Sequence, residues 1–341
     1  MNEKRNAFLR ADTPTLADVA RLANVSEITA SRVVRNRQPI AEATRLRVLS
    51  AIQQLGYIPN RAAGSLASAG STLISVVLPS LSNIVFAEVL NGIHSALSGT
   101  PFQAVIGVTD YDREAEARIV RSFLEWQPAA IIVVGLHHTP AARGYLEKGR
   151  FRVGELMDID GEAIDVAVGM SHRQAGYDSG RHLLQRGYRR LGYVGHDLEA
   201  DDRARARYEG LCAALRDSGL PPPAERRFDV PTSTTAGRDL LALLLTEHPG
   251  LDAVVFSNDD MAVGGFFYCL EKGIRPKEQL ALFGFSGLEI GQALPMPLST
   301  VRSQRFLAGK LIVEKLLASR ERPAEKVTID IGYEIVEGAT A

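Results

Sequence analysis

Residues 15–68 read TLADVARLANVSEITASRVVRNRQPIAEATRLRVLSAIQQLGYIPNRAAGSLAS, and this stretch decides how the N-terminal part of the chain folds. Thr15 followed by Asp18 is typical of a capping box, which begins a helix. Apolar residues then recur at helical spacing up to Asn24, a residue type that tolerates the left-handed backbone of a sharp turn. Ser26 can cap a second helix, and a third is expected over residues 42–55. The stretch therefore predicts an all-α helix-turn-helix unit.

The second helix is predicted to turn its Ala and Val residues inward and its polar and basic residues outward. A capped helix with such an outer face can lie in the major groove of DNA. Arg32 is the best candidate to pair with guanine, a contact worth roughly 1–3 kcal/mol of discrimination, and Ile28 could touch a thymine methyl group. Arg35, like Arg37 and Arg45, is expected to meet phosphates. The candidate DNA contacts of this helix are Ser26, Glu27, Ile28, Thr29, Ser31, Arg32 and Arg35. The sequence also allows a small helical bundle with a solvated basic face.

The charge of the chain is unevenly distributed. Residues 1–70 carry ten Lys or Arg against five Asp or Glu, whereas the remainder carries 29 against 35. A basic head on an acidic body suits contact with phosphates at one end only.

Several other classes of protein are disfavoured by composition. Cys212 and Cys269 lack metal-ligand spacing, so we expect reduced thiols, no metal and no cofactor. The N-terminus lacks the apolar core of a signal peptide, and no apolar run reaches about 18 residues. We therefore expect a cytoplasmic protein without a membrane partner.

The remainder of the chain alternates buried strands with helices. Apolar runs such as LISVVLP, AAIIVVGL, LGYVG and LALFGF are typical of parallel strands, and patterns such as REAEARIVRSFLEW lie between them as helices. This predicts a doubly wound α/β body in two halves. Because ligands in such sheets bind beyond the carboxyl ends of the strands, residues that follow the runs are the candidates for a binding site.

Two segments of the head, TLADVARLANVSEITASRVV and TRLRVLSAIQQLGYIPNRA, resemble the lactose-repressor (LacI/GalR) family of bacterial transcription regulators. In that family the first two residues of the recognition helix and a later Arg read bases, which implies this role for Glu27, Ile28 and Arg32. The family usually has Gly where Asn24 stands. Glu27 and Ile28 are not the commonest pair, so the operator sequence stays open.

The connector YIPNRAAGSLASAGS contains a short Ala-rich stretch after Pro59, and seven or eight residues that include Gly64 cannot sustain a helix alone in water. Composition alone allows a plain linker. The match of PNRAAGSLA to the family's hinge implies a helix formed on DNA, with Asn60 and Arg61 near the minor groove and Leu66 wedged between base pairs.

The body resembles the family's effector domain, which is like a periplasmic sugar-binding protein. Segments such as VGELMD, SNDDMAVGG and FGFSGLEIG look most similar to gluconate-operon repressors. The resemblance implies a headpiece at 13–57, a hinge at 58–71 and an effector and dimerisation domain at 72–341. Its N-lobe would hold about 72–167 and 287–322, and its C-lobe about 168–286 and 323–341, with crossings near Val168, Ser286 and Pro323.

The expected ligand is a sugar acid, because an Asp found in many sugar-responding members is replaced by Ser286. Two like charges about 4 Å apart at partial burial would cost on the order of 4 kcal/mol, and Ser286 removes that repulsion. Arg305 could hold a carboxylate bidentately, and Arg207 matches the family's ligand-gripping Arg. Alternatively, Arg305 is a surface residue and Arg207 a salt bridge between lobes. The candidate effector-binding residues are Asn83, Phe86, Tyr111, His137, Met170, Arg207, Asn258, Asp259, Ser286 and Arg305.

The resemblance implies a homodimer, or a tetramer, that represses genes of gluconate uptake and catabolism from a palindromic double-stranded operator until the effector binds. The sequence does not separate gluconate from 2-ketogluconate, 6-phosphogluconate, idonate or a neutral sugar. Enzyme functions are disfavoured because the G-x-G-x-x-G and G-x-x-x-x-G-K-[ST] motifs are missing and Leu288 occupies the second Gly of a nucleophile elbow. A cytosolic sugar-binding protein is the distant alternative.

Overall fold

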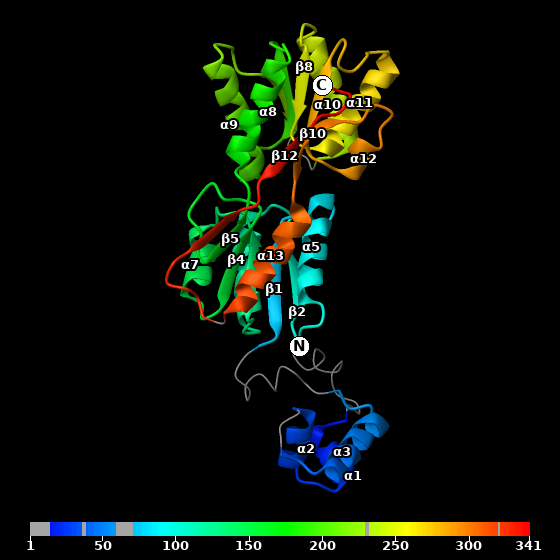
Figure 1. Cartoon of the computed structure of the whole chain (residues 1–341), viewed down its shortest axis with the longest axis vertical. Coiled ribbons are helices and arrows are strands. Elements are labelled where there is room, and N and C mark those ends of the chain that lie inside the picture. The colour runs from blue at the N-terminus through cyan, green and yellow to red at the C-terminus, as the bar shows by residue number, and fades with distance from the viewer. Residues whose placement is uncertain (1–13, 36–38, 59–70, 229–231, 320) are drawn as a thin grey trace, which may run out of the picture. The chain divides into compact units, whose positions relative to one another are not determined.

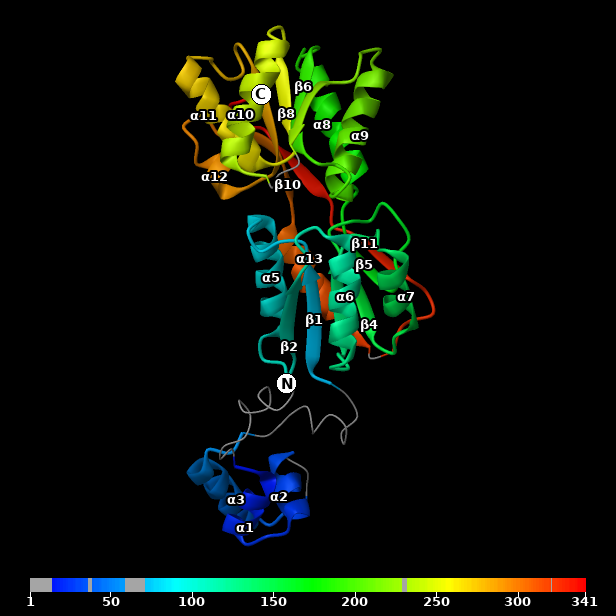
Figure 2. The same cartoon turned by 180° about the vertical axis from the view of Figure 1, so that it is seen from behind.

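The computed structural model describes residues 14–35, 39–58, 71–228, 232–319 and 321–341. The chain forms two compact units, Met1–Gly70 and Ser71–Ala341. Figures 1 and 2 show the helical first unit and the α/β second unit from opposite sides. The predicted classes of both units, an all-α head and a two-lobed α/β body, are confirmed.

The head consists of α1 (Leu16–Ala23), α2 (Glu27–Val34) and α3 (Glu42–Leu55). The predicted capping box is present: Thr15 Oγ1 accepts from the Asp18 amide at 3.3 Å, and the Asp18 carboxylate accepts from the Thr15 amide at 2.9 Å. Asn24 has a φ of 51°, the left-handed conformation expected at the turn. Local side-chain signals therefore position α1 and α2 relative to each other.

A small apolar core holds the three helices of the head together. Val19, Ala30 and Val48, one from each helix, are completely buried. Ile52 and Leu55 of α3 pack partly buried against this cluster. Because the inner faces are occupied in this way, the opposite face of α2 is left to solvent.

The first lobe of the body is a parallel sheet in the order β11-β5-β4-β3-β1-β2. Its strands are β1 (Leu73–Leu78), β2 (Gln103–Val108), β3 (Ala130–Val134), β4 (Arg152–Leu156), β5 (Val166–Gly169) and β11 (Val327–Asp330). Its helices are α5 (Ile84–Leu97), α6 (Arg113–Leu124), α7 (Pro140–Lys148) and α13 (Arg305–Ala318). The α5 and α13 helices pack side by side and cover the sheet with an apolar cluster.

The second lobe repeats this plan in the order β12-β10-β9-β8-β6-β7, with β12 antiparallel to its neighbour. Its strands are β6 (Leu191–His196), β7 (Ala224–Phe228), β8 (Ala253–Phe256), β9 (Ala281–Ser286), β10 (Ser299–Ser303) and β12 (Tyr333–Val336). Its helices are α8 (His172–Gln185), α9 (Asp202–Asp217), α10 (Thr234–Glu247), α11 (Asp259–Lys272) and α12 (Glu289–Gln292).

The chain passes between the lobes at three places, two of which differ from expectation (Figures 1 and 2). The first crossing lies between Gly169 and His172, close to the predicted position. The second lies at Gln304, between β10 and α13, and the third lies between β11 and β12. The predicted crossings at Ser286 and Pro323, and the lobe boundaries drawn from them, are therefore wrong. The reason is that residues 287–303 stay in the second lobe, where they form α12 and β10, and residues 323–330 stay in the first lobe, where they lead into β11.

Five strands are absent from the sequence prediction, namely β4, β7, β10, β11 and β12, and each of them contains polar or charged residues. β7 reads AERRF and lies at a sheet edge, and β10 reads STVRS. β7 carries no continuous apolar run because only part of its surface meets a core. β4 is buried throughout, but its run is interrupted by Arg152 and Glu155, whose partners inside the lobe are Asp165 and the Ile164 amide. Such strands are recognised only from their pairing partners.

Candidate functional site

A cavity of about 330 Å³ lies between the two lobes of the body. It is lined from the first lobe by side chains at the starts of α5 and α13, and from the second lobe by the start of α9 and the loops after β6, β8 and β9. Eight residues predicted from sequence line it, namely Asn83, Phe86, Tyr111, Met170, Arg207, Asn258, Ser286 and Arg305. Most of the residues selected by the rule that ligands bind beyond the carboxyl ends of parallel strands therefore line this one cavity.

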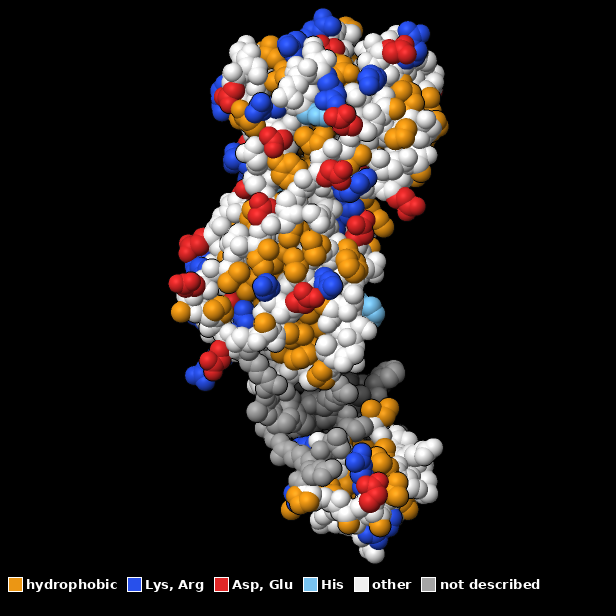
Figure 3. Space-filling model, viewed as in Figure 1, with side chains coloured by type: hydrophobic (Ala, Val, Ile, Leu, Met, Phe, Trp, Pro, Cys, Tyr) orange, Lys and Arg blue, Asp and Glu red, His pale blue; other side chains and the backbone are white. Residues whose placement is uncertain are grey.

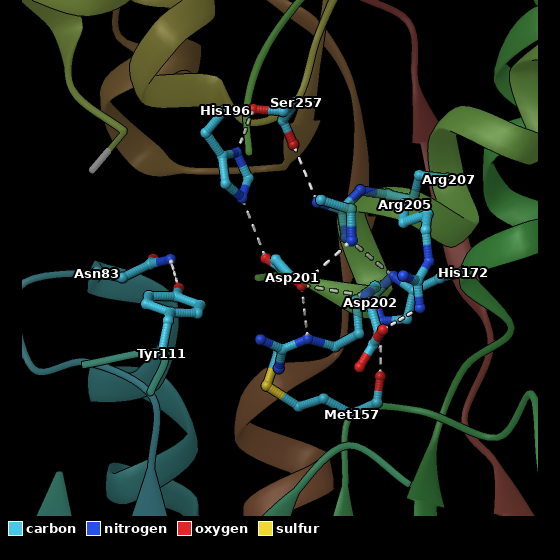
Figure 4. Close-up of polar contacts among 12 residues, drawn as sticks. Asn83, Tyr111, Met157, His172, His196, Asp201, Asp202, Arg205, Arg207 and Ser257 are labelled. Atoms are coloured by element: carbon cyan, nitrogen blue, oxygen red, sulfur yellow. Dashed lines mark hydrogen bonds and ion pairs between the residues drawn. The ribbon is translucent and has the colours of Figure 1, made fainter. Parts of the chain in front are cut away.

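Arg207 is fixed by three contacts in the second lobe, and Figure 4 shows the two polar ones, to Ser257 and His172. Its Nη2 donates to the main-chain oxygen of Ser257 at 3.2 Å, and its Nη1 lies 3.1 Å from His172 Nδ1. Its guanidinium carbon sits 4.2 Å from the centre of the Phe285 ring. Burial lowers the pKa of Arg207, but a guanidinium keeps its proton in a protein. The cavity wall therefore carries a fixed positive charge.

His172 is held in one tautomer by its neighbours. Since Arg207 can only donate, His172 Nδ1 must accept, and His172 Nε2–H donates to the main-chain oxygen of Met157 at 2.7 Å. Burial, reinforced by the charge of Arg207, lowers the pKa of His172 well below its usual value. A neutral imidazole thus orients Arg207 and ties the second lobe to the end of β4.

A second charged group lies at the start of α9. Asp201 caps the helix by accepting from the amides of Arg203 at 3.1 Å and Ala204 at 3.2 Å. His196 Nε2 lies 3.5 Å from the other carboxylate oxygen. Burial opposes ionisation of Asp201, yet the nearby Arg203 charge and the hydrogen bond from His196 hold its pKa well below the usual value. Asp201 therefore remains an anion that organises the helix start.

The first lobe contributes a polar pair and an aromatic ring. Asn83 caps α5 by accepting from the Val85 amide at 3.2 Å, and its Nδ2 donates to the Tyr111 hydroxyl at 3.4 Å. Burial raises the pKa of Tyr111 above its usual value, so the phenol stays protonated. Phe86 in the first turn of α5 is buried, and its ring centre lies 5.7 Å from the guanidinium carbon of Arg203.

Two predicted residues do not line the cavity. Asp259 is fully buried beneath α12, where its carboxylate accepts from the Leu288 amide and from the Thr300 hydroxyl, both at 2.6 Å. Burial raises the pKa of Asp259 to about 6. Its neighbour Asp260 lines the cavity instead, because consecutive side chains on a helix point in different directions. His137 lies on a neighbouring cavity of about 70 Å³.

Arg305 lines the cavity but is already paired. Its Nη2 and Nε donate to the carboxylate of Glu88 on α5 at 2.8 and 3.1 Å. Its Nη1 donates to the main-chain oxygen of Ser286 and, at 3.2 Å, to Ser303. Ser286 has a φ of 126°, which non-glycine residues rarely adopt, so Arg305 helps to hold a strained loop. Arg305 therefore lies on the cavity as predicted, but its guanidinium is paired with Glu88, and its contact with a ligand carboxylate stays a prediction.

Several lining residues are absent from the sequence prediction, chiefly His172, His196, Asp201 and Arg203. The run LGYVG becomes β6, which ends at His196, and the rule applied to the other strands would have pointed to this end and to the loop that leads to Asp201. His172 also follows a predicted strand, but its role as an acceptor for Arg207, which is 35 residues away, cannot be read from that position.

The outer face of α2 is available for contact. Ile28 is 75% exposed, and Glu27, Arg32 and Arg35 are exposed as well. Ser26 and Thr29 are partly committed to the helix start, since Ser26 Oγ accepts from the Thr29 amide at 3.2 Å and lies 2.9 Å from Thr29 Oγ1. Ser31 is half-buried. The hinge predictions for Asn60, Arg61 and Leu66 lie outside the described residues.

Two kinds of feature are absent from the described residues. No group of three or more His, Cys, Asp or Glu side chains in that part of the chain is placed to hold a metal ion. None of the described helices combines the length and the apolar character needed to cross a membrane.

Sequence comparison assigns both units. Residues 15–60 match bacterial regulatory proteins of the lacI family, and residues 71–333 match the periplasmic binding proteins and sugar binding domain of LacI family. The chain is 37% identical to the HTH-type transcriptional regulator GntR of Pseudomonas aeruginosa, over 95% of this chain and 94% of that protein. It is 34% identical to the HTH-type transcriptional regulator IdnR of Escherichia coli, over 96% and 98%.

Solved structures agree with this assignment. A LacI family transcriptional regulator from Silicibacter pomeroyi is 40% identical and superimposes with a TM-score of 0.91, covering 96% of this chain and 99% of that one. The lac repressor dimer bound to operator and an anti-inducer is 25% identical, with a TM-score of 0.83 and coverage of 96% and 99%.

Proposed function

The chain belongs to the lacI family of bacterial regulatory proteins, and we propose that this transcriptional regulator is a repressor of sugar-acid uptake and catabolism genes. In this proposal the head binds a palindromic operator, and a sugar acid such as gluconate binds between the lobes and releases the DNA. The protein acts in the cytoplasm, where its operator lies.

The observation that carries the proposal is the buried guanidinium of Arg207 on the wall of the interlobe cavity. Arg207 is buried, oriented by His172 and stacked on Phe285, and it faces a lining rich in hydrogen-bonding groups. Ser286 stands on the same lining and adds no negative charge. Guanidinium groups suit carboxylates, and the Ser, Asn and Asp side chains suit hydroxyls, so a polyhydroxy acid fits better than a neutral sugar.

The coupling mechanism depends on the fact that the lobes share the cavity. Arg113 on α6 donates to Asp202 on α9 at 2.7 Å, which already bridges the lobes. An effector that contacts Asn83 on one side and Arg207 on the other stabilises the closed arrangement further. If operator binding requires a different lobe arrangement, the two ligands oppose each other with a coupling free energy of typically 1–3 kcal/mol.

A homodimer through the first lobe is part of the proposal. Ile84 on α5 is 50% exposed and Phe306 on the adjacent α13 is 46% exposed. Figure 3 shows hydrophobic side chains gathered on this face of the lobe. Exposed apolar surface of this kind supports an interface between subunits, and a twofold dimer would match a palindromic operator.

The test begins with selection of operator DNA from a random pool by the full-length protein, followed by fluorescence anisotropy at several salt concentrations. We expect affinity to fall steeply with salt. Arg32→Ala should relax the preference at one base position, whereas Arg45→Ala should weaken all sequences alike and reduce the salt slope by about 1. A flat salt response, or no selected sequence, would remove the assigned role of the head.

Effector release is tested on the same complex with gluconate, 2-ketogluconate, 6-phosphogluconate and glucose. We expect at least one acid to dissociate the wild-type complex. Arg207→Ala should retain operator affinity and lose release. If glucose alone dissociates the complex, the alternative of a neutral sugar is correct. If Arg207→Ala responds at the wild-type concentration of acid, the cavity is not the effector site.

A further inference from the structure

Arg203 is a buried cation with an unused donor. It stands at the start of α9, where its side chain is only 11% exposed and lines the interlobe cavity. Its Nε lies 3.4 Å from an Asp201 carboxylate oxygen. Its Nη1 is buried and finds no hydrogen-bond partner among the described residues. A buried donor without an acceptor lowers the stability of a protein, and the loss is larger when the group is charged. A ligand that supplies an acceptor for Arg203 Nη1 would remove this loss.

The other two guanidinium groups of the cavity are differently occupied. Arg207 uses Nη1 on His172 and Nη2 on Ser257, and Arg305 donates through Nε and Nη2 to Glu88. Arg207 therefore supplies mainly charge to the cavity, and Arg305 is neutralised by its partner. Among the guanidinium groups of the described cavity lining, Arg203 is left with a buried Nη1 that lacks an acceptor.

The surroundings of Arg203 favour an anion. Arg203 and Arg207 are four residues apart on one helix, so their side chains lie on the same face. The N-terminus of α9 adds the partial positive charge of the helix dipole. Asp201 offsets part of this charge, but its oxygens are shared with two amides of α9 and with His196. Asp110, Asp197 and Asp260, also on the cavity lining, would repel an anion elsewhere and accept from hydroxyls.

We infer that the anionic end of the effector binds at Arg203, whose Nη1–H donates to a carboxylate or phosphate oxygen beside the fixed charge of Arg207. This inference rests on the proposed function, an acidic polyol as effector, and identifies the residue that selects for the acid. Because the Arg203 guanidinium also lies against Phe86 of the first lobe, an anion bound there is held at the junction of both lobes.

The test is calorimetric titration of the full-length protein with gluconate, glucitol 6-phosphate and glucitol. These probes carry a carboxylate, a phosphate and no charge on similar polyol chains. The wild type should prefer at least one anionic probe to glucitol by tenfold or more. Arg203→Gln should reduce that preference at least tenfold and leave the affinity for glucitol nearly unchanged. The preferred anion in the wild type identifies the headgroup as carboxylate or phosphate.

Arg205→Gln is the matched control, since Arg205 lies on the same helix but pairs with Asp202 and is not part of the cavity lining. It should keep the wild-type preference, and circular dichroism should show that both variants fold. If Arg203→Gln keeps the preference, or loses all three probes equally, the inference is overturned while the proposed function stands. If the wild type itself shows no preference for either anion, the sugar-acid proposal fails and the inference with it.

Discussion

The packing of α8 against α9 sets the position of Arg207, and Gly176→Ala perturbs that packing directly. A Cβ added at Gly176 would lie 1.9 Å from the main-chain oxygen of Arg207 and 2.7 Å from its carbonyl carbon. The contact is reciprocal, because a Cβ at Gly210 would lie 2.1 Å from the main-chain oxygen of Arg173. The two helices therefore touch backbone to backbone at these two glycines.

The magnitude follows from the geometry of the clash. A carbon-to-oxygen contact needs about 3.3 Å, so α8 and α9 would have to separate by more than about 1 Å. Overpacking of this kind costs typically 1–3 kcal/mol, and the upper end applies because a backbone cannot rotate away as a side chain can. For a unit of this size, about 3 kcal/mol lowers Tm by roughly 6–12 °C. A shift of the Arg207 backbone should also break its 3.1 Å hydrogen bond to His172 and weaken effector binding by about tenfold or more.

The assay is thermal unfolding combined with calorimetric titration of the effector found by the release experiment. Gly144→Ala is the matched control, because Gly144 lies inside α7 and an added Cβ meets nothing within 4 Å. There Ala should stabilise the protein by about 0.5–1 kcal/mol. If Gly176→Ala unfolds at the wild-type temperature and binds effector normally, the helices are not in close contact and the account of how Arg207 is positioned is wrong.

Three further perturbations have defined outcomes. Burial lowers the pKa of His138, but hydrogen bonds to Glu116 at 2.7 Å and Glu155 at 3.3 Å outweigh burial and raise this pKa to about 9. The protonated imidazole should therefore contribute fully to the free energy of unfolding below pH 6.5. That contribution should be lost as the pH rises to about 9. Denaturant unfolding across that range checks this, and His138→Gln should flatten the dependence. Arg113→Ala removes the partly exposed ion pair with Asp202 that joins the lobes. Effector affinity measured by titration should fall two- to fivefold, which corresponds to about 0.5–1 kcal/mol. Unchanged affinity would mean that this ion pair is irrelevant to closure of the lobes. Val48 is fully buried in a small core, so Val48→Ala should lower the free energy of unfolding of the head by about 2 kcal/mol. Operator binding measured by anisotropy should be abolished, and effector binding measured by titration should be unchanged. A parallel loss of effector binding would contradict the independence of the two units.

The parts of this fold that could be predicted from sequence are those specified by near neighbours. The capping box at Thr15 and the left-handed turn at Asn24 depend on atoms within four residues, and both are present. The apolar runs of β1, β3 and β9 are buried on both faces of parallel sheets, so their composition alone identifies them. Polar edge strands such as β7 carry no such mark, because solvent tolerates any residue there.

The parts that could not be predicted depend on partners distant in sequence. The sequence predicts that Arg305 faces a ligand, but Glu88, 217 residues away, takes its guanidinium. Asp259 and Asp260 are equivalent in composition, and only the rotation of α11 decides that one is buried under α12 and the other faces the cavity. A family resemblance gives the position of such residues in the chain, but the hydrogen-bond partners decide whether each group is free to bind.

The division of the cavity between two lobes limits which ligands can act as effectors. A ligand shifts the equilibrium between lobe arrangements only through contacts that differ between them, and moving it from 1:99 to 99:1 takes about 5.5 kcal/mol. Contacts confined to the second lobe, such as those with Asn258, are equally available in both arrangements and contribute nothing to that difference. A charge-assisted hydrogen bond contributes about 1.5–3 kcal/mol, so about two to four must form only on closure. A ligand meets this condition when it joins Asn83 or Tyr111 of the first lobe to Arg203 of the second, whose guanidinium lies over the Phe86 ring at the junction. A ligand that binds tightly to Arg207 but does not reach these groups should therefore occupy the cavity without releasing DNA, and an acid long enough to span both lobes should bind and release.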